Sequence, residues 1–177
     1  RPISFEVFSD DFRDMERQAM QIADWGENVY VKIPVTNTTR VPSFELVRRL
    51  AQNKVKLNVT ALMTLAQVRS VVAALAPNVP SFVSVFAGRI ADTGRDPVPL
   101  MAAAVELLKE SPAAQLIWAS PREVLNNFQA DAIGCHVITV TNDILKKISL
   151  IGFDLDEYSL ETVKMFYNDA RAAAFHL

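Results

Sequence analysis

The sequence predicts an α/β fold built on a parallel sheet, and three observations lead to this prediction. Short apolar runs rich in Val, Ile and Phe alternate with longer segments of helical periodicity along the 177 residues. The short runs are apolar on both faces, which is typical of strands in a parallel sheet. Capping and turn residues separate the two kinds of segment. Alternation of this kind indicates βα units joined by right-handed crossovers.

Six strands and seven helices follow from this pattern. The strands are predicted at residues 3–8, 29–33, 55–60, 81–86, 115–119 and 137–140. The helices are predicted at residues 10–25, 43–52, 65–75, 98–110, 121–132, 142–148 and 159–174. Together they make residues 1–177 a single domain, with residues 150–177 as a C-terminal helical segment.

Local residues support the ends of these elements. Gly26 and Gly134 follow helices and precede strands, where a left-handed C-cap is favoured. Ser43, the Ser120-Pro121 pair and Ser159 are expected helix starts, because Ser caps a helix N-terminus and Pro suits the first turn.

Composition and charge exclude several classes of function. Half of the chain is hydrophobic, the net charge is −2 and the basic residues are scattered, so neither a nucleic-acid surface nor a membrane surface is expected. No run reaches the roughly 18 uncharged apolar residues that span a bilayer. The single cysteine, Cys135, excludes an internal disulfide framework and fits a reducing, cytoplasmic compartment.

Two architectures accommodate six βα units: an open doubly wound sheet, or part of an eight-stranded (β/α)8 TIM barrel. A nucleotide-binding open sheet would show a glycine-rich turn after its first strand, and the five glycines form no such loop. Polar residues instead recur at the carboxyl ends of successive strands, where barrel enzymes assemble their sites. They are Glu6, Lys32, Asn58 with Thr60, Ser84 with Arg89, and Ser120 with Arg122. The sequence therefore favours part of a TIM barrel.

Lys32 is the most unusual of these residues, because it lies inside an apolar run at residues 29–36, Val-Tyr-Val-Lys-Ile-Pro-Val-Thr. Burial in such a strand would desolvate the ammonium group and lower its pKa. A partly neutral lysine is a nucleophile that forms a Schiff base with a carbonyl compound. The alternative is a lysine on an edge strand that points into solvent and prevents aggregation.

The other polar residues would complete such chemistry. A Schiff-base lysine needs a nearby acid or base to move protons, and Glu6 and Thr60 on the flanking strands would hold a water for that purpose. Arg89, Ser120 and Arg122 combine two guanidinium groups with a hydroxyl, which is a natural phosphate clamp. Each residue also has a plain structural interpretation: Glu6 as an edge charge, Thr60 as a helix cap, and the arginines as solubilising surface groups.

Several motifs, in order along the chain, resemble the transaldolase family, which includes the fructose-6-phosphate aldolases. Residues 31–36, Val-Lys-Ile-Pro-Val-Thr, resemble its lysine strand. Residues 57–60, Leu-Asn-Val-Thr, followed by Ala66-Gln67, resemble its next strand and helix. Residues 83–90, Val-Ser-Val-Phe-Ala-Gly-Arg-Ile, resemble its Ser-Pro-Phe-Val-Gly-Arg-Ile segment, and residues 119–122, Ala-Ser-Pro-Arg, resemble its Ala-Ser-Phe-Arg. Residues 4–7, Ser-Phe-Glu-Val, resemble the strand of its catalytic glutamate.

The resemblance implies a class I aldolase-type barrel with a role for each matching residue. Lys32 would carry the Schiff base with the dihydroxyacetone unit of a ketose phosphate, and Glu6 and Thr60 would position the proton-transferring water. The sugar would be bound by Asn58, Ser84 and Phe86, and its phosphate by Arg89, Ser120 and Arg122. The resemblance further implies sugar-phosphate substrates, a place in the pentose phosphate pathway, a homo-oligomer, and neither a metal nor an organic cofactor.

Departures from the family pattern accompany these matches. Val85 replaces the usual proline, Pro121 replaces phenylalanine, and the loop at residues 92–97 adds charges beside Arg89. The family's first two strands, with a catalytic aspartate and a substrate-binding asparagine, have no counterpart. The resemblance therefore implies the last six βα units of the barrel plus a C-terminal helix, without the N-terminal two βα units.

Three functions stay open at this point. One is transfer of a dihydroxyacetone unit between sugar phosphates, and another is fructose-6-phosphate aldolase chemistry that releases free dihydroxyacetone. Phe86 favours transfer, because the resembling aldolases have a tyrosine there, whose hydroxyl would help to order water. The third function is non-catalytic binding of sugar phosphates on the same scaffold. Retention of Lys32 and Glu6 argues against it.

Overall fold

The structure is a computed structural model in which residues 1–174 are described. It divides into two compact units, Arg1–Thr141 and Asn142–Leu177. The C-terminal helical segment predicted from the sequence starts at position 150, and the second unit begins eight residues before that position. The site residues predicted from the sequence all belong to the first unit.

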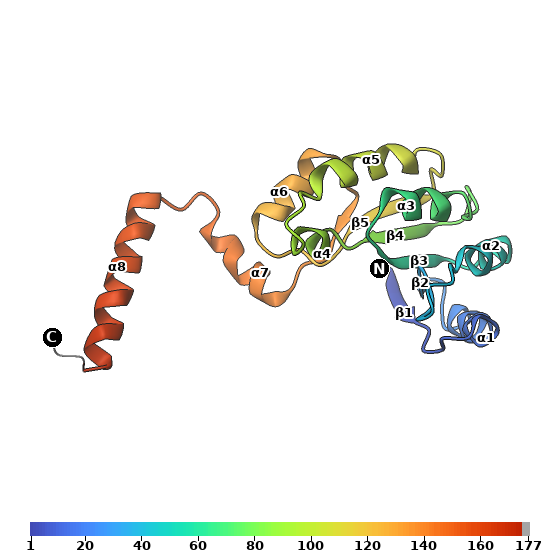
Figure 1. Ribbon diagram of the computed structural model, residues 1–177, viewed down its shortest axis with the longest axis horizontal. Coiled ribbons are helices and arrows are strands. Elements are labelled where there is room, and N and C mark those ends of the chain that lie inside the picture. The colour runs from blue at the N-terminus through green and yellow to red at the C-terminus, as the bar shows by residue number, and fades with distance from the viewer. Residues whose placement is uncertain (175–177) are drawn as a thin grey trace. The chain divides into compact units, whose positions relative to one another are not determined.

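Six parallel strands form the sheet of the N-terminal unit, in the order β1-β2-β3-β4-β5-β6. Their bounds are β1 Ile3–Glu6, β2 Val29–Pro34, β3 Leu57–Leu62, β4 Ser81–Val85, β5 Ala114–Trp118 and β6 Val137–Ile138. Strands that are consecutive in sequence are neighbours in the sheet, which is the topology of a (β/α) barrel and not of a doubly wound sheet. The sheet is curled, and the helices lie along its outer side (Figure 1). The predicted α/β class and partial TIM barrel are confirmed.

Six helices alternate with or follow these strands. Their bounds are α1 Phe12–Ala23, α2 Phe44–Gln52, α3 Leu65–Val72, α4 Ala87–Ala91, α5 Val98–Leu108 and α6 Leu125–Ala132. Helices α1 and α2 pack against each other, and so do α3 and α5 (Figure 1). Helix α4 is missing from the predicted set, because five residues are too few to show a helical period.

Several predicted boundaries in this unit, among them those of β1, β3, α3 and β6, differ by two or three residues from the observed ones. The predicted start of α6 and the predicted conformation of Gly26 are wrong. Helix α6 begins at Leu125 rather than at position 121, because Ser120 adopts a φ of 58° and the chain then turns before the helix. The side-chain oxygen of Asn126 accepts hydrogen bonds from the amides of Arg122 and Glu123 in that turn. Gly134 is left-handed as expected, with a φ of 72°, but Gly26 is not.

The strands send alternate side chains to opposite faces of the sheet, and this alternation creates two apolar layers. Outward-facing residues pack against the helices in the main core, whose fully buried members include Val31, Ile33, Leu57, Val59 and Trp118. A smaller cluster on the inner face consists of Tyr30, Phe82, Ile117 and Ala119. Because the main core holds the strands from outside, the inner face can present polar groups without loss of the fold.

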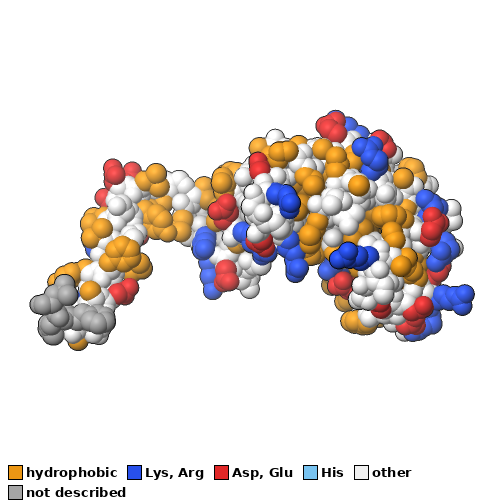
Figure 2. All heavy atoms as spheres, viewed as in Figure 1, with side chains coloured by type: hydrophobic (Ala, Val, Ile, Leu, Met, Phe, Trp, Pro, Cys, Tyr) orange, Lys and Arg blue, Asp and Glu red, His pale blue; other side chains and the backbone are white. Residues whose placement is uncertain are grey.

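The regular elements of the C-terminal unit, within the part of it that the structure describes, are all helices. Its elements are α7 Asn142–Lys147, a 3-10 turn at Ile148–Leu150, and α8 Leu155–Ala172. Helix α8 begins before the predicted start at Ser159, because the Asp154 carboxylate caps it by accepting from the amides of Asp156 and Glu157. Within this unit none of the α8 side chains is buried, and hydrophobic side chains follow its length (Figure 2). Among residues 1–174, no helix combines the length and the apolar character needed to cross a membrane.

Candidate functional site on the inner face of the sheet

A row of side chains crosses the inner face of the sheet. The strand register pairs Glu6 of β1 with Lys32 of β2, and Lys32 with Asn58 of β3. Residues paired in register on parallel strands point to the same face, so these three polar side chains are neighbours. Phe82 and Gln115 continue the row on β4 and β5. The register thus brings together three residues that are 26 positions apart from one to the next along the chain.

Lys32 forms an ion pair with Glu6. Its Nζ donates to Oε2 of Glu6 at 3.2 Å, and the two side chains are 31% and 48% exposed. The expected loss of hydration is therefore only partial, because the inner face of this open sheet leaves water access to the ammonium group. The pair places a proton acceptor directly beside the candidate nucleophile.

Asn58 of β3 is fixed by hydrogen bonds to one side chain of β1 and one side chain of β4. Its Nδ2 donates to Oγ of Ser4 at 3.0 Å, and its Oδ1 accepts from Oγ of Ser84 at 2.7 Å. Asn58 is 7% exposed and Ser84 is 4% exposed, so this network lies beneath the surface of the site. One amide proton of Asn58 is left over from these contacts and is available to a bound molecule.

Thr60 presents a buried hydroxyl that has no partner. The residue is 3% exposed, and its Oγ1 makes no hydrogen bond within the part of the chain that is described. The next residue, Ala61, has a φ of 65°, and the pairing between β3 and β4 shifts register between Val59 and Leu62. A buried hydroxyl without a hydrogen-bond partner is rare, because it lowers the stability of the fold. The Thr60 hydroxyl in this irregular stretch is therefore available to bind a ligand or a water.

These residues surround a cavity of about 650 Å³. Six of the nine predicted site residues line it, namely Lys32, Asn58, Thr60, Ser84, Phe86 and Ser120. The floor is apolar, with Phe82, Ile117 and Val137. A mostly apolar cavity with a few converging polar groups is the usual form of a small-molecule site. Glu6, Arg89 and Arg122 do not line it, although Glu6 reaches it through Lys32.

The backbones of the β4–α4 and β5–α6 connections are packed tightly together at one side of the cavity. A Cβ atom added to Gly88 would lie 1.5 Å from the carbonyl oxygen of Ser120, so only glycine fits there. The Gly88 amide also donates to the Ala119 carbonyl at 3.2 Å. Ser120, strained at its positive φ, donates its amide to Oγ1 of Thr139 at 3.3 Å. These backbone contacts fix the position of Ser120 and the backbone positions from which the side chains of Arg89 and Arg122 extend.

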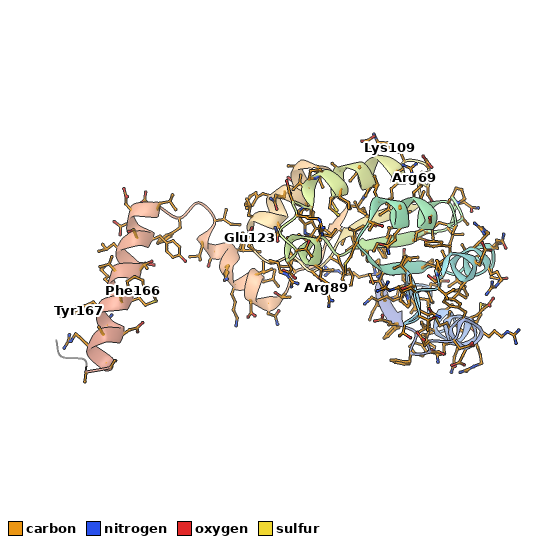
Figure 3. The ribbon with its side chains drawn as sticks, viewed as in Figure 1. Arg69, Arg89, Lys109, Glu123, Phe166 and Tyr167 are labelled. Carbon is orange, nitrogen blue, oxygen red and sulfur yellow. The ribbon has the colours of Figure 1, made fainter. Side chains whose placement is uncertain are left out.

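Both predicted clamp arginines extend from this junction and already have partners. The Arg89 guanidinium lies over the Phe86 ring, 5.5 Å from its centroid, and Figure 3 labels Arg89 on α4. Arg122 donates from Nε to Oδ1 of Asp92 at 2.9 Å and from Nη2 to Oδ2 of the same carboxylate. These hydrogen bonds lower the pKa of the Asp92 carboxyl, the charges of Arg122 and Arg89 lower it further, and the same pair raises the pKa of Arg122. Asp92 is therefore ionised at neutral pH.

Four polar residues of the site are missing from the set of predicted site residues: Ser4, Gln115 and Thr139, which line the cavity, and Asp92, which contacts Arg122. The first three lie two residues from predicted or inner-facing positions, at Glu6, Ile117 and Val137. Because side chains alternate with period two, that spacing was a usable signal. Asp92 belongs to the loop at residues 92–97 that the sequence indicates as adding charges beside Arg89, but its contact with Arg122 gave no signal, because this contact bridges 30 positions and depends on the unpredicted helix α4.

Comparison with known proteins agrees with the sequence motifs. The chain is 32% identical over 145 residues to a protein named "Probable transaldolase" from Clostridium kluyveri, with 81% of this chain and 64% of that protein covered. A "Probable transaldolase" from Dehalococcoides mccartyi is 34% identical over 147 residues, with 82% and 64% covered. One from Thermoanaerobacter sp. is 30% identical over 164 residues, with 92% and 71% covered. The chain thus spans a little under two thirds of the length of the first two relatives.

A solved structure and a family model extend this comparison. A mandelate oxidase mutant, solved with an FMN adduct, superposes with a TM-score of 0.55 at 16% identity, covering 78% of this chain and 48% of that one. At such low identity the likeness concerns the fold alone. The model described as "Transaldolase/Fructose-6-phosphate aldolase" matches residues 1–177, and the chain therefore belongs to the transaldolase/fructose-6-phosphate aldolase family.

Proposed function

We propose that the protein is a transaldolase-type transferase that moves a dihydroxyacetone unit between sugar phosphates through a Schiff base at Lys32. The observation that carries this proposal is the inner-face row, in which Lys32 lines the cavity, lies 3.2 Å from the Glu6 carboxylate and stands beside the fixed amide of Asn58. Family membership supports the same chemistry. The activity, the sugar-phosphate substrates, the pentose phosphate pathway, a cytoplasmic location and a homo-oligomeric state all belong to this proposal.

The reaction would begin with loss of a proton from Lys32 to Glu6, directly or through a water. The neutral Nζ then attacks the ketose carbonyl, and loss of water from the carbinolamine leaves an iminium ion. A base then takes the proton of the hydroxyl group on the β-carbon, and the bond between the α- and β-carbons of the iminium breaks. This step would release an aldehyde, and the electron pair of the broken bond would leave an enamine on Lys32. Attack of the enamine carbon on an acceptor aldehyde forms the new bond, and hydrolysis of the resulting iminium returns the lysine.

Proton transfer in this scheme would depend on Glu6 and Thr60. Every step that forms or loses water needs a group that gives and takes a proton close to Nζ. The Glu6 carboxylate is within hydrogen-bond distance of Nζ, and the unpartnered Thr60 hydroxyl lines the same cavity. A water held between the two would satisfy Thr60 and connect it to the carboxylate.

Substrate binding would fall to the fixed polar groups of the cavity and its edge. Asn58 and Ser84 would hydrogen-bond the hydroxyl groups of the ketose, because their network leaves an amide proton and hydroxyl lone pairs free. Arg89, Ser120 and Arg122 would bind the phosphate. Ser120 lines the cavity, and the two arginines extend from the junction that Gly88 and Ser120 make.

The direct test of the proposed function is reductive trapping. Treatment of the full-length protein with borohydride in the presence of dihydroxyacetone or fructose 6-phosphate should reduce the iminium ion to a stable amine. Peptide mass mapping should then find the adduct on the peptide that contains Lys32. A protein that binds sugar phosphates without catalysis would form no adduct, and an adduct on another lysine would refute the assignment.

Phe86 separates transfer from free aldol cleavage. We expect Phe86→Tyr to raise the ratio of fructose 6-phosphate cleavage to ketol transfer, because a phenol hydroxyl in the cavity would help to order the water that protonates the enamine. The two rates are measured with and without an aldehyde acceptor. An unchanged or smaller ratio would count against the role of Phe86, and rapid cleavage by the unmodified protein without acceptor would favour the aldolase function instead.

A further inference from the structure

The charged loop after α4 contributes one carboxylate to the candidate phosphate site. Asp92 is the residue at the C-terminal end of α4, and its two carboxylate oxygens accept from Nε and Nη2 of Arg122. The other acidic residue of this loop, Asp96, accepts from the backbone amide of Val98 at 2.9 Å, at the start of α5. The loop thus brings an acid into contact with a clamp arginine through Asp92.

The ion pair with Asp92 occupies the guanidinium N–H groups of Arg122 that would bind a phosphate. The Nε and Nη2 groups present two parallel N–H bonds, which is the fork that grips carboxylate or phosphate in a bidentate manner. Asp92 fills this fork. Ser120, two residues earlier, lines the cavity, but Arg122 does not. The arginine therefore holds an internal anion at the edge of the site rather than presenting a free fork to the cavity.

We propose that Asp92 is an internal competitor of the substrate phosphate, occupying Arg122 in the empty site and giving it up when a phosphate binds. This inference rests on the proposed phosphate clamp of Arg89, Ser120 and Arg122. Each binding event must break the Asp92–Arg122 pair, so Asp92 sets how tightly the clamp holds a phosphorylated sugar. In the proposed transfer reaction two phosphorylated aldehydes use the site in succession, and a resident carboxylate speeds release of the first by taking back the arginine.

The surroundings of the pair suit exchange. The side chains of Arg122 and Asp92 are 49% and 50% exposed, and ion pairs of such exposure are weak because water screens them. A phosphate dianion carries about twice the charge of a carboxylate and offers three acceptor oxygens, so it competes well for the fork. The Arg122 amide is held by Oδ1 of Asn126 at 2.7 Å, and Gly88 is packed on Ser120. The exchange therefore needs movement of side chains alone.

The test is calorimetric titration of the full-length protein with inorganic phosphate, for wild type, Asp92→Asn, Arg122→Ala and the double variant. We expect Asp92→Asn to lower the phosphate dissociation constant by about three- to tenfold, because the pair no longer has to be broken and a like charge is removed. We expect Arg122→Ala to raise it. In the Arg122→Ala background the gain from Asp92→Asn should be smaller, because no pair remains to be broken.

Glu123→Gln is the matched control. Glu123 follows Arg122 in the chain and is exposed, and Figure 3 labels it ahead of α6. Its substitution by Gln removes one negative charge, as Asp92→Asn does. Within residues 1–174 its carboxylate makes no hydrogen bond or ion pair with a side chain, so we expect no resolvable change in phosphate affinity. Equal tightening by Glu123→Gln and Asp92→Asn would show a general charge effect and overturn the role of Asp92.

The remaining outcomes separate this inference from the function on which it rests. Unchanged or weaker phosphate binding by Asp92→Asn, together with weaker binding by Arg122→Ala, would overturn the competitor while leaving the clamp in place. Unchanged binding by Arg122→Ala would overturn the clamp and Asp92 with it. Reductive trapping of dihydroxyacetone on Lys32 involves no phosphate, so it should be the same in all four proteins and reports on the Schiff base independently.

Discussion

Replacing Lys32 with Met is expected to abolish turnover of the full-length protein while its fold stays intact. Met keeps an unbranched side chain of similar length but has no amine, so neither carbinolamine nor iminium can form. We expect the rate to fall by at least about a thousand-fold, as when a covalent nucleophile is removed. The half-exposed pair with Glu6 contributes little to stability, so the melting temperature should change by only a few degrees. The measurements are steady-state ketol transfer and thermal unfolding.

Lys56→Met is the control for a general effect of removing a lysine from this sheet. Lys56 directly precedes β3, and its Nζ donates to the backbone carbonyl of Glu27 at a place that does not line the cavity. This variant should keep its activity and should be trapped by borohydride as wild type is. Activity of Lys32→Met within tenfold of wild type would rule out the Schiff-base mechanism, whatever the effect on stability.

The arrangement of the strands could be predicted because each buried strand has a recognisable pattern in its own residues. Runs such as residues 29–36 and 81–86 are apolar on both faces, and a parallel sheet is where such runs are stable. The neighbour order followed from the short, regular βα units. Local signals failed where the chain conformation depends on another segment. The region from Ser120 to Asn126 looks like a capped helix start, but the close approach of Gly88 holds Ser120 in a left-handed turn and delays the helix.

The candidate site was predictable to the extent that it follows strand positions. Lys32, Asn58 and Thr60 were found because polar residues in buried strands are conspicuous, and the register then places Lys32 between Glu6 and Asn58. The solvent exposure and the charge partners of these side chains could not be predicted in the same way. The partial hydration of Lys32 depends on the openness of the inner face, and the pairing of Arg122 with Asp92 depends on where α4 ends. Sequence thus indicated which groups take part, whereas their charge partners needed the three-dimensional structure.

Arg122→Ala is expected to weaken binding of phosphorylated substrates strongly and to spare unphosphorylated ones. Loss of a charge-assisted bidentate contact raises KM by roughly thirty- to a thousand-fold. The side chain is 49% exposed, and solvent screening places the effect near the lower end of that range. Kinetics with fructose 6-phosphate and with dihydroxyacetone, side by side, measure the difference.

The nature of the arginine contact can be resolved with three further variants. Arg89→Ala should act in the same direction, and Arg122→Lys should recover only part of the loss, because an ammonium group cannot reproduce the planar fork of a guanidinium. Arg95→Ala is the matched control: Arg95 lies in the loop beside Asp92, and its guanidinium donates to Oγ1 of Thr93 rather than to Asp92. It should change neither substrate class. If Arg122→Ala altered KM equally for phosphorylated and unphosphorylated substrates, Arg122 would be a solvated charge at the edge of the cavity and the phosphate would have to bind elsewhere.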